Sequence, residues 1–241
     1  PAAAAGATAY ALPVSGIRVD GDLADWPPGL PEVAIAAAGA MYGGQPDLLG
    51  QDLLSSPDLS ATFRAGYDAQ KDLVYVAVRV RDDALVAGNG WTQTDGCEVY
   101  LGGAGPVHQY YLVPGAGHYG ADSENPGVMG AAWSTTGSQA AWRRTGDVTV
   151  YEWAVAAYDQ PGSPADLQPG QQLPFDVALA DRDGADGPAA WVTWGPYVVQ
   201  KYGGASRVGT LVLLAPGAPL ASLEGTVVLT GHRVQAREGD R

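Results

Sequence analysis

The stretch from Ala61 to Asp83, ATFRAGYDAQKDLVYVAVRVRDD, constrains the fold more than any other part of this sequence. In its second half, valine occupies every even position from Val74 to Val80, and more varied residues occupy the odd positions. A period of two with many β-branched side chains is typical of a strand that buries one face. The first half also alternates, and the two halves are separated by the polar turn DAQKD. The stretch therefore predicts a β-hairpin with one face in a hydrophobic core.

Strand-like runs recur along the chain, and segments rich in Gly, Pro and Asp separate them. We expect further short strands at 17–19, 33–37, 94–103, 107–117, 140–159 (a second hairpin with its turn near 145–147), 173–180 and 207–216. Long loops are expected at 27–60 and 120–140. About 9–10 strands at regular spacing with almost no helix predict an all-β fold, an antiparallel β-sandwich with a jelly-roll-like arrangement.

Composition agrees with this fold class. Hydrophobic residues make up 46% of the chain and charged residues 16%, with 34 Gly and 18 Pro, which suits many strands joined by turns and does not suit a helical bundle. A chain of 241 residues is ordinary for one sandwich with long loops and can bury a core without covalent staples. The single cysteine, Cys97, excludes an internal disulfide, and it lies in the apolar run CEVYL as a small buried residue.

The formal net charge of −13 limits the partners. A surface that binds phosphates needs the opposite sign, so we expect no nucleic-acid partner, and an anionic membrane surface is disfavoured for the same reason. We also expect no membrane insertion, because no stretch has the length of a membrane-spanning helix. Excess carboxylate suits an oxygen-ligated cation such as calcium, although it also simply keeps a protein soluble.

We divide the chain into three parts. Residues 1–15, rich in small apolar side chains, are expected to form a flexible leader or linker. Residues 16–215 are expected to form the β-sandwich. Residues 216–241 contain the apolar run LEGTVVL and then become polar, which indicates a C-terminal tail, a linker or an added edge strand.

Several segments, taken in order, resemble one known family. They are VDGDLADW near the start, the hairpin at 61–83, WTQTDGCEVYL, VHQYYLVPGAG, and the strands VTVYEWAVAAYD and GQQLPFDVALADRDG, of which the former carries a characteristic Glu. In this order and spacing, over residues 16–214, they are similar to family 9 carbohydrate-binding modules. The wider fold group resembles DOMON-like β-sandwiches, some of which bind sugars and others haem. The resemblance implies a non-catalytic domain that binds a saccharide, in a secreted, extracellular, cell-surface or periplasmic location.

The resemblance also implies a sugar held between two Trp rings. Trp91 matches the first ring by position, and either Trp191 or Trp194 matches the second. Trp is suited to this role because it offers a large rigid apolar face. The alternative is that these rings close the end of the sandwich, as we expect Trp26 and Trp153 to pack in the core. Planar polar side chains would bond the sugar hydroxyls. The candidates for this role are Asp95, Glu98, Gln109, Tyr111, Arg79 and Arg81.

Carboxylates concentrate in three turns. They are Asp20, Asp22 and Asp25 in DGDLAD, Asp82 and Asp83 in RDD, and Asp181, Asp183 and Asp186 in DRDGADG. The family resemblance implies structural Ca²⁺, which takes six to eight oxygen ligands. Ordinary turn chemistry is the alternative, because Asp and Gly favour turns in any case.

No enzyme motif is present, so we expect no catalytic activity. Two other functions remain open. The chain is a structural or sensor subunit of the cell surface that contacts neighbouring domains or copies of itself, or it is a haem-binding electron-transfer domain. Haem is disfavoured, and we expect no organic cofactor, because the axial ligands would have to come from a small set: Met41, Met129, His108 or His118.

Overall fold

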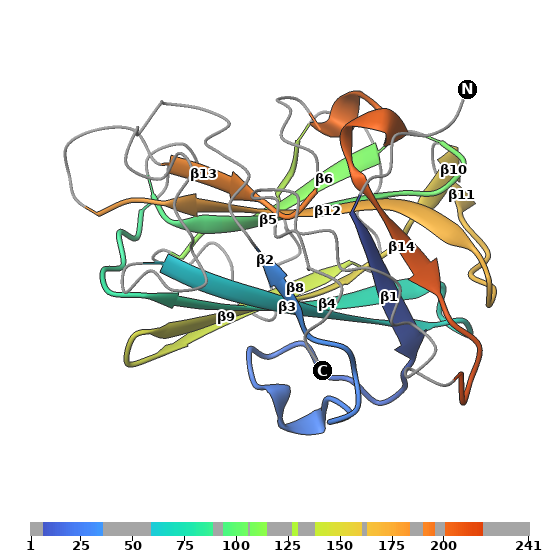
Figure 1. Ribbon diagram of the computed structural model, residues 1–241, viewed down its shortest axis with the longest axis horizontal. Coiled ribbons are helices and arrows are strands. Elements are labelled where there is room, and N and C mark those ends of the chain that lie inside the picture. Colours follow the sequence, from blue (N-terminus) through green and yellow to red (C-terminus); the bar gives the residue numbers. More distant parts are fainter. Residues whose placement is uncertain are drawn as a thin grey trace, which may run out of the picture.

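The computed structural model (Figure 1) describes residues 7–35, 59–88, 94–105, 107–114, 127–129, 138–160, 163–183, 190–195 and 201–218. Their strands are β1 (Thr8–Pro13), β2 (Val33–Ile35), β3 (Leu59–Asp68), β4 (Leu73–Asp82), β5 (Gly96–Gly102), β6 (Val107–Leu112), β7 (Gly127–Met129), β8 (Gln139–Thr145), β9 (Val148–Val155), β10 (Tyr158–Gln160), β11 (Ser163–Pro164), β12 (Gln172–Asp181), β13 (Ala190–Thr193) and β14 (Gly209–Leu213). The 3₁₀ turns are η1 (Leu23–Asp25), η3 (Lys201–Gly203) and η4 (Ala205–Arg207). Within the described ranges, no helix is long and apolar enough to cross a membrane.

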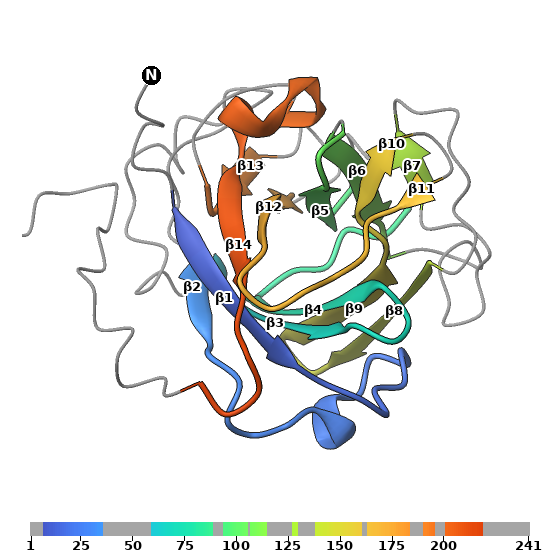
Figure 2. The same cartoon turned by 90° about the vertical axis from the view of Figure 1, so that its right-hand side faces the viewer.

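The strands form two layers that face each other, as Figures 1 and 2 show. The first sheet has the order β7-β6-β5-β12-β14-β1, with β13 paired to β12. The second has the order β1-β3-β4-β9-β8, with β2 paired to β3. Apart from the pairings of β1, the strand pairs of both sheets are antiparallel. The prediction of an all-β sandwich is therefore confirmed. The strands outnumber the expectation because β1, β13 and the very short β7, β10 and β11 were not expected.

Strand β1 belongs to both sheets. Its first part pairs in parallel with β14, from Thr8 opposite Thr210 to Ala11 opposite Leu213. Its last two residues pair in parallel with β3, Leu12 opposite Gly66 and Pro13 opposite Tyr67. The expectation of a flexible leader therefore does not hold for Thr8–Pro13. Small alanines at alternate positions let this strand fit between the layers, and Ala9 and Ala11 are both buried.

The expected strand at Ile17–Val19 is absent. Ile17 and Val19 are buried, but they pack in a small cluster with Trp26 outside the main core and make no strand ladder. What fixes this segment is the carboxylate of Glu152 on β9. It accepts hydrogen bonds from the backbone N–H groups of Asp20 (2.9 Å) and Gly21 (2.8 Å) and from Nε1 of Trp26 (2.8 Å). The D-G-x-x-x-x-W motif and the distant Glu are thus one structural unit.

Both hairpins expected from the sequence are present. β3 and β4 pair from Leu59 opposite Asp82 to Asp68 opposite Leu73, and β8 pairs with β9 around a turn at Gly146 and Asp147. Gly146 has φ +63°, a conformation that glycine adopts without steric cost.

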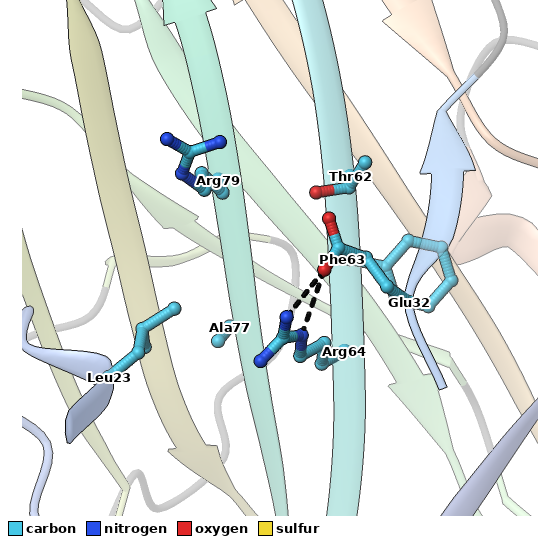
Figure 3. A pocket seen from close by; sticks show the side chains of 7 residues that line it. All are labelled: Leu23, Glu32, Thr62, Phe63, Arg64, Ala77 and Arg79. Carbon is cyan, nitrogen blue, oxygen red and sulfur yellow. Dashed lines mark hydrogen bonds and ion pairs between the residues drawn. The ribbon is translucent and has the colours of Figure 1, made fainter. Parts of the chain in front are cut away.

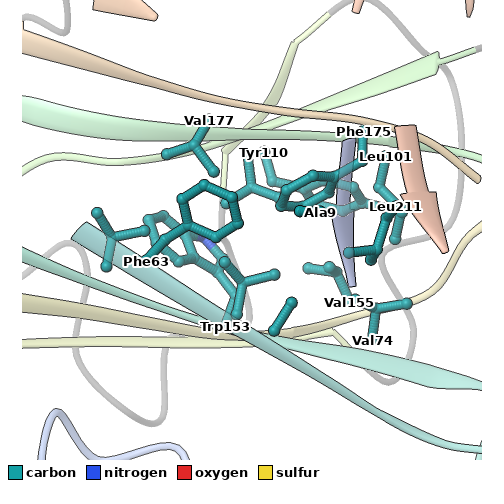
Figure 4. Packing of buried hydrophobic residues seen from close by; sticks show 14 of the residues in the cluster. Ala9, Phe63, Val74, Leu101, Tyr110, Trp153, Val155, Phe175, Val177 and Leu211 are labelled. Atoms are coloured by element: carbon teal, nitrogen blue, oxygen red, sulfur yellow. The ribbon is translucent and has the colours of Figure 1, made fainter. Parts of the chain in front are cut away.

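The main core lies between the two sheets and takes alternate side chains from each. The even-numbered valines of β4 point into it, as the period of two requires. Trp153 from the second sheet packs there with Phe175 and Tyr110 from the first (Figure 4). Trp153 and Trp26 are both buried, as expected.

Candidate functional site

The face of the first sheet that points away from the core carries a group of polar side chains. On β5, Cys97, Val99 and Leu101 point into the core, so Glu98 and Tyr100 point to the opposite, outer face. The same alternation places Gln109 and Tyr111 of β6 on that outer face. Asp176 and Ala178 of β12 lie there as well. We call this surface, defined by Glu98, Tyr100, Gln109, Tyr111, Asp176 and Trp191, the outer polar face.

Glu98 is the centre of the outer polar face. Its Oε1 accepts a hydrogen bond from Nε2 of Gln109 (2.7 Å), and its Oε2 accepts one from the hydroxyl of Tyr100. Only 2% of Glu98 is exposed. Burial raises the pKa of Glu98 to about 7, against the lowering effect of these two hydrogen bonds. At neutral pH this carboxyl group can therefore either accept or donate a proton.

Tyr111 and Trp191 flank this centre. Tyr111 lies opposite Glu98 across the β5–β6 pair and is half-buried. Trp191 lies opposite Ala180 on β12 and packs with Tyr100 and other apolar groups of the same face. The structure thus brings together four of the residues selected from the sequence. Trp91, selected as the first sugar-binding ring, lies outside the described residues.

Trp194 does not belong to the outer polar face. Its ring centroid lies 5.1 Å from that of Phe63 and 5.9 Å from that of Phe175, both in the main core. Residues 192 and 194 share the inward orientation because the side chains alternate along the chain. Of the two alternatives for the second ring, only Trp191 therefore lies on the same face as Glu98.

Arg79 and Arg81 lie on the outer face of the second sheet, away from Glu98. They occupy odd positions of β4, whose even positions fill the core. Arg81 makes an exposed ion pair with Asp147 (3.3 Å). Arg79 lines a shallow pocket of about 240 Å³, in which Nε of Arg64 donates to Glu32 (3.1 Å; Figure 3). These two arginines therefore cannot act on the same ligand as the outer polar face.

A second polar site lies where β4, β5 and β12 meet at one end of the sandwich. Carboxylate oxygens of Asp82, Asp95 and Asp181 lie within 4.8 Å of one another, and all three residues are buried. Asp95 accepts hydrogen bonds from the backbone N–H groups of Arg182 (2.7 Å) and Val86 (2.6 Å). Burial, followed by the nearby charge of Asp82, raises the pKa of Asp95 to about 7. Asp95 was selected as a sugar ligand, but it lies in this carboxylate cluster.

Among the described residues, the other carboxylates selected as metal ligands are not part of this cluster. Asp20 and Asp22 accept hydrogen bonds from backbone N–H groups in their own turn, and Asp22 also binds Arg143 (2.9 Å). Asp25 accepts a hydrogen bond from the backbone N–H of Arg18 (2.7 Å). These three carboxylates thus make the contacts expected of ordinary turn chemistry, and a calcium ion at this turn stays a prediction. Two further candidates, Asp83 and Asp183, are exposed, and Asp186 is outside the described residues.

One polar pair was not anticipated from the sequence. Nζ of Lys201, in η3, lies 2.6 Å from Oδ2 of Asp176 on β12, and both side chains are fully buried. A lysine in a loop carries no periodic signal, and its partner lies 25 residues away, so no sequence pattern could reveal the contact. The candidate haem ligand His108 is buried and packs against Tyr158 (centroids 5.1 Å apart). The side chains of Met41, Met129 and His118 lie outside the described part of the chain.

Residues 44–215 match the family described as carbohydrate family 9 binding domain-like. Because this match covers well over half of the chain, the chain belongs to that family. The family resemblance found in the sequence is thereby confirmed.

Solved structures of this family share the fold. A family 9 carbohydrate-binding module from Caldicellulosiruptor kristjanssonii in complex with cellotriose has a TM-score of 0.63 at 14% identity, covering 88% of this chain and 96% of that chain. A family 9 module from the same organism in complex with glucose has a TM-score of 0.62 at 14% identity, covering 88% of this chain and 98% of that chain. No curated protein matches this chain. At such low identity these likenesses establish the fold.

Proposed function

We propose that this chain is a non-catalytic carbohydrate-binding domain of a secreted or cell-surface protein and that it binds a saccharide at the outer polar face. The observation that carries the proposal is the family match over residues 44–215. The complexes of the two related modules with cellotriose and glucose support a glucose-containing ligand. The periplasm would suit the same function.

The outer polar face offers the chemistry that a sugar needs. The half-buried ring of Tyr111 can pack against the C–H face of a pyranose ring, whereas Trp191 on the same face is buried among apolar neighbours. Glu98 and Gln109 are planar polar side chains, but both are buried, and the Glu98 carboxylate already accepts hydrogen bonds from Tyr100 and Gln109. They therefore hold the face in one arrangement around Tyr111. Tyr111 is the most accessible of the four, so we assign it the first contact with the ligand. As the family resemblance implies, Trp91 would supply a further ring.

We also propose that Asp82, Asp95 and Asp181 hold a structural Ca²⁺. Calcium takes only oxygen ligands and tolerates irregular geometry, which suits three converging carboxylates. A bound divalent cation would offset the mutual repulsion that contributes to the raised pKa of Asp95. The wider DOMON-like grouping of this fold, and contacts with neighbouring domains or further copies of the chain, stay predictions.

Intrinsic Trp fluorescence tests sugar binding. Titration of the whole chain with cellotriose and glucose should give a saturable change in emission. Tyr111→Ala should weaken the affinity at least tenfold, because it removes the accessible ring of the site. Arg79→Ala is the matched control, since it removes an exposed side chain from the opposite sheet and should leave the affinity unchanged.

Two outcomes would contradict the proposal. A folded protein whose emission does not respond to either sugar, and that shows no binding by calorimetry, would favour a structural subunit of the cell surface. Equal loss of affinity in Tyr111→Ala and Arg79→Ala would move the site away from the outer polar face.

A further inference from the structure

The burial of Lys201 is unusual for its residue type. The sequence contains only two lysines, Lys71 and Lys201. The side chain of Lys71 is 54% exposed and pairs with Asp68 at the surface, whereas that of Lys201 is 0% exposed. Lysine is almost never fully buried unless it is paired, and taking both charges of a pair out of water costs several kcal/mol per ion. Lys201 must therefore gain enough from its buried partner to offset the cost of losing its contact with water.

The partner carboxyl group is held in one orientation. Oδ1 of Asp176 accepts hydrogen bonds from the backbone N–H groups of Gly195 (2.7 Å) and Val177 (2.8 Å) and from the hydroxyl of Thr193 (3.2 Å). Oδ2 faces Nζ of Lys201 at 2.6 Å. The two oxygens thus have different roles: three donors surround one, and the amine contacts the other.

The surroundings bring the backbone unusually close to this carboxyl group. A Cβ added to Gly195 would lie 2.2 Å from Oδ2 of Asp176, so only glycine fits at that position. η3, which carries Lys201, contacts β6, the neighbour of β5 in the first sheet. Neither the side chain of Lys201 nor that of Asp176 is accessible to solvent.

Burial favours the neutral forms of both groups. It raises the pKa of Asp176 and lowers the pKa of Lys201, in each case against the attraction between the two partners. A neutral amine carries the lone pair that a nucleophile needs, and a protonated carboxyl group is the electrophile that can lose water. Proton transfer within the pair supplies both forms at once.

Glu98 is the third member of the group. It projects from β5 on the same face as Asp176 on the adjacent β12, since Glu98 lies opposite Ala178 and Asp176 opposite Tyr100. The charges of Glu98 and Lys201 act on each other. Tyr100 and Gln109 fix its carboxyl group, and its pKa near 7 suits a group that both takes up and returns a proton.

We propose that Lys201 and Asp176 become joined by an intramolecular isopeptide bond, with Glu98 as the proton-transfer group. Nζ of Lys201 attacks Cγ of protonated Asp176, and the new Nζ–Cγ bond places negative charge on Oδ1. The donors from Gly195, Val177 and Thr193 stabilise that charge. Glu98 takes a proton from the nitrogen and delivers it to Oδ2. The Cγ–Oδ2 bond then breaks, water leaves, and a neutral amide remains. The reaction needs no oxidant and no cofactor.

The measurement is the intact mass of the denatured, purified whole chain. The mass should be lower than the sequence mass by one water molecule. After proteolysis, a branched peptide should connect the segment containing Lys201 with the segment containing Asp176. Amine-reactive labelling in denaturant should modify Lys71 and leave Lys201 unmodified, so the exposed lysine acts as an internal control.

Variants separate the reaction from the fold. Lys201→Arg removes the nucleophile and should give the full sequence mass, and Glu98→Gln should leave a folded protein in which most molecules keep the full mass. Lys71→Arg should still lose the water molecule. A folded wild-type chain that retains its full mass and labels at both lysines would overturn the proposal and leave a buried ion pair. Loss of water with a cross-link elsewhere would overturn it as well.

Discussion

At the scale of single residues, three buried carboxyl groups with different surroundings perform different tasks. Glu152 accepts hydrogen bonds from the N-terminal turn and secures it to β9. Asp95 converges with two other carboxylates, and Asp176 contacts an amine. Residue type and spacing do not distinguish these tasks, because each of them depends on what the fold places opposite the carboxyl group.

Glu152→Ala should destabilise the fold strongly. It leaves Nε1 of Trp26 and two backbone N–H groups without their acceptor, and each unsatisfied buried donor costs about 1–3 kcal/mol. We expect the free energy of unfolding, measured by urea denaturation, to fall by about 3 kcal/mol or more. Glu32→Ala is the control, because it breaks solvent-accessible contacts with Arg64 and Thr62 and should cost only about 0.5–1 kcal/mol. Equal effects of the two substitutions would show that the Glu152 contacts are not required.

Some residues of the outer polar face could be predicted from the sequence, and others were assigned to it wrongly. The family resemblance selected Glu98 and Trp191 from the sequence, and Gln109 and Tyr111 were added because residues two apart on a strand project from the same face. The arginines of β4 were assigned to the same site because no pattern tells which of two sheets a strand joins. Such pairing depends on contacts between distant segments.

At the scale of the elements, the hairpins were predictable and β1 was not. In β4 the alternation of valine with more varied residues predicts the face that enters the main core. β1 consists of small and mixed residues, so its sequence is like that of a linker, and its strand conformation comes from two partners that are remote in the chain. The segment around Ile17 was expected to be a strand because its residues are apolar. They are buried, but they pack without pairing with another strand.

Ala11→Asp tests whether β1 is a structural element. Ala11 is completely buried between the sheets, so the new carboxylate would be desolvated without a partner. We expect the free energy of unfolding to fall by about 3 kcal/mol or more, enough to unfold a marginally stable domain. Thr8, in the same strand, is exposed, so Thr8→Asp should change the free energy of unfolding by less than about 0.5 kcal/mol. A minor effect of Ala11→Asp in thermal and urea denaturation would argue that β1 detaches easily.

At the scale of the whole molecule, the carboxylate cluster connects the two sheets. Asp82 ends β4 of the second sheet, whereas Asp95 precedes β5 and Asp181 ends β12 of the first. A cation held there would join the layers at one end of the sandwich, while β1 joins them at one edge. The stability of the entire domain should therefore respond to this single site.

The pH dependence of stability should reveal the cation. Without calcium, folded Asp95 has a pKa of about 7 compared with 3.8 for the ordinary group, so the folded state binds more protons between these values. The free energy of unfolding in EDTA should therefore fall as the pH rises from 4 to about 7. Saturating Ca²⁺ should remove this loss and stabilise the protein at pH 7 by about 2–3 kcal/mol.

Asp95→Asn supplies the control for the cation. This substitution removes one charge and one titrating group from the cluster. The free energies of unfolding measured in calcium and in EDTA should therefore differ less, while the pH dependence that comes from Glu98 remains. Urea titrations at several pH values measure both effects. Identical curves with and without calcium in the unsubstituted chain would show that the cluster holds no Ca²⁺.

The parallel pairing of β1 with β14 has a mechanical consequence. The two strands run side by side in the same direction, so tension applied to the chain before Thr8 and after Leu213 pulls them past each other along their length. All the hydrogen bonds between β1 and β14 would then bear the load together, whereas strands pulled apart from one end release their bonds one at a time. The whole ladder would therefore resist extension of the chain between these two strands.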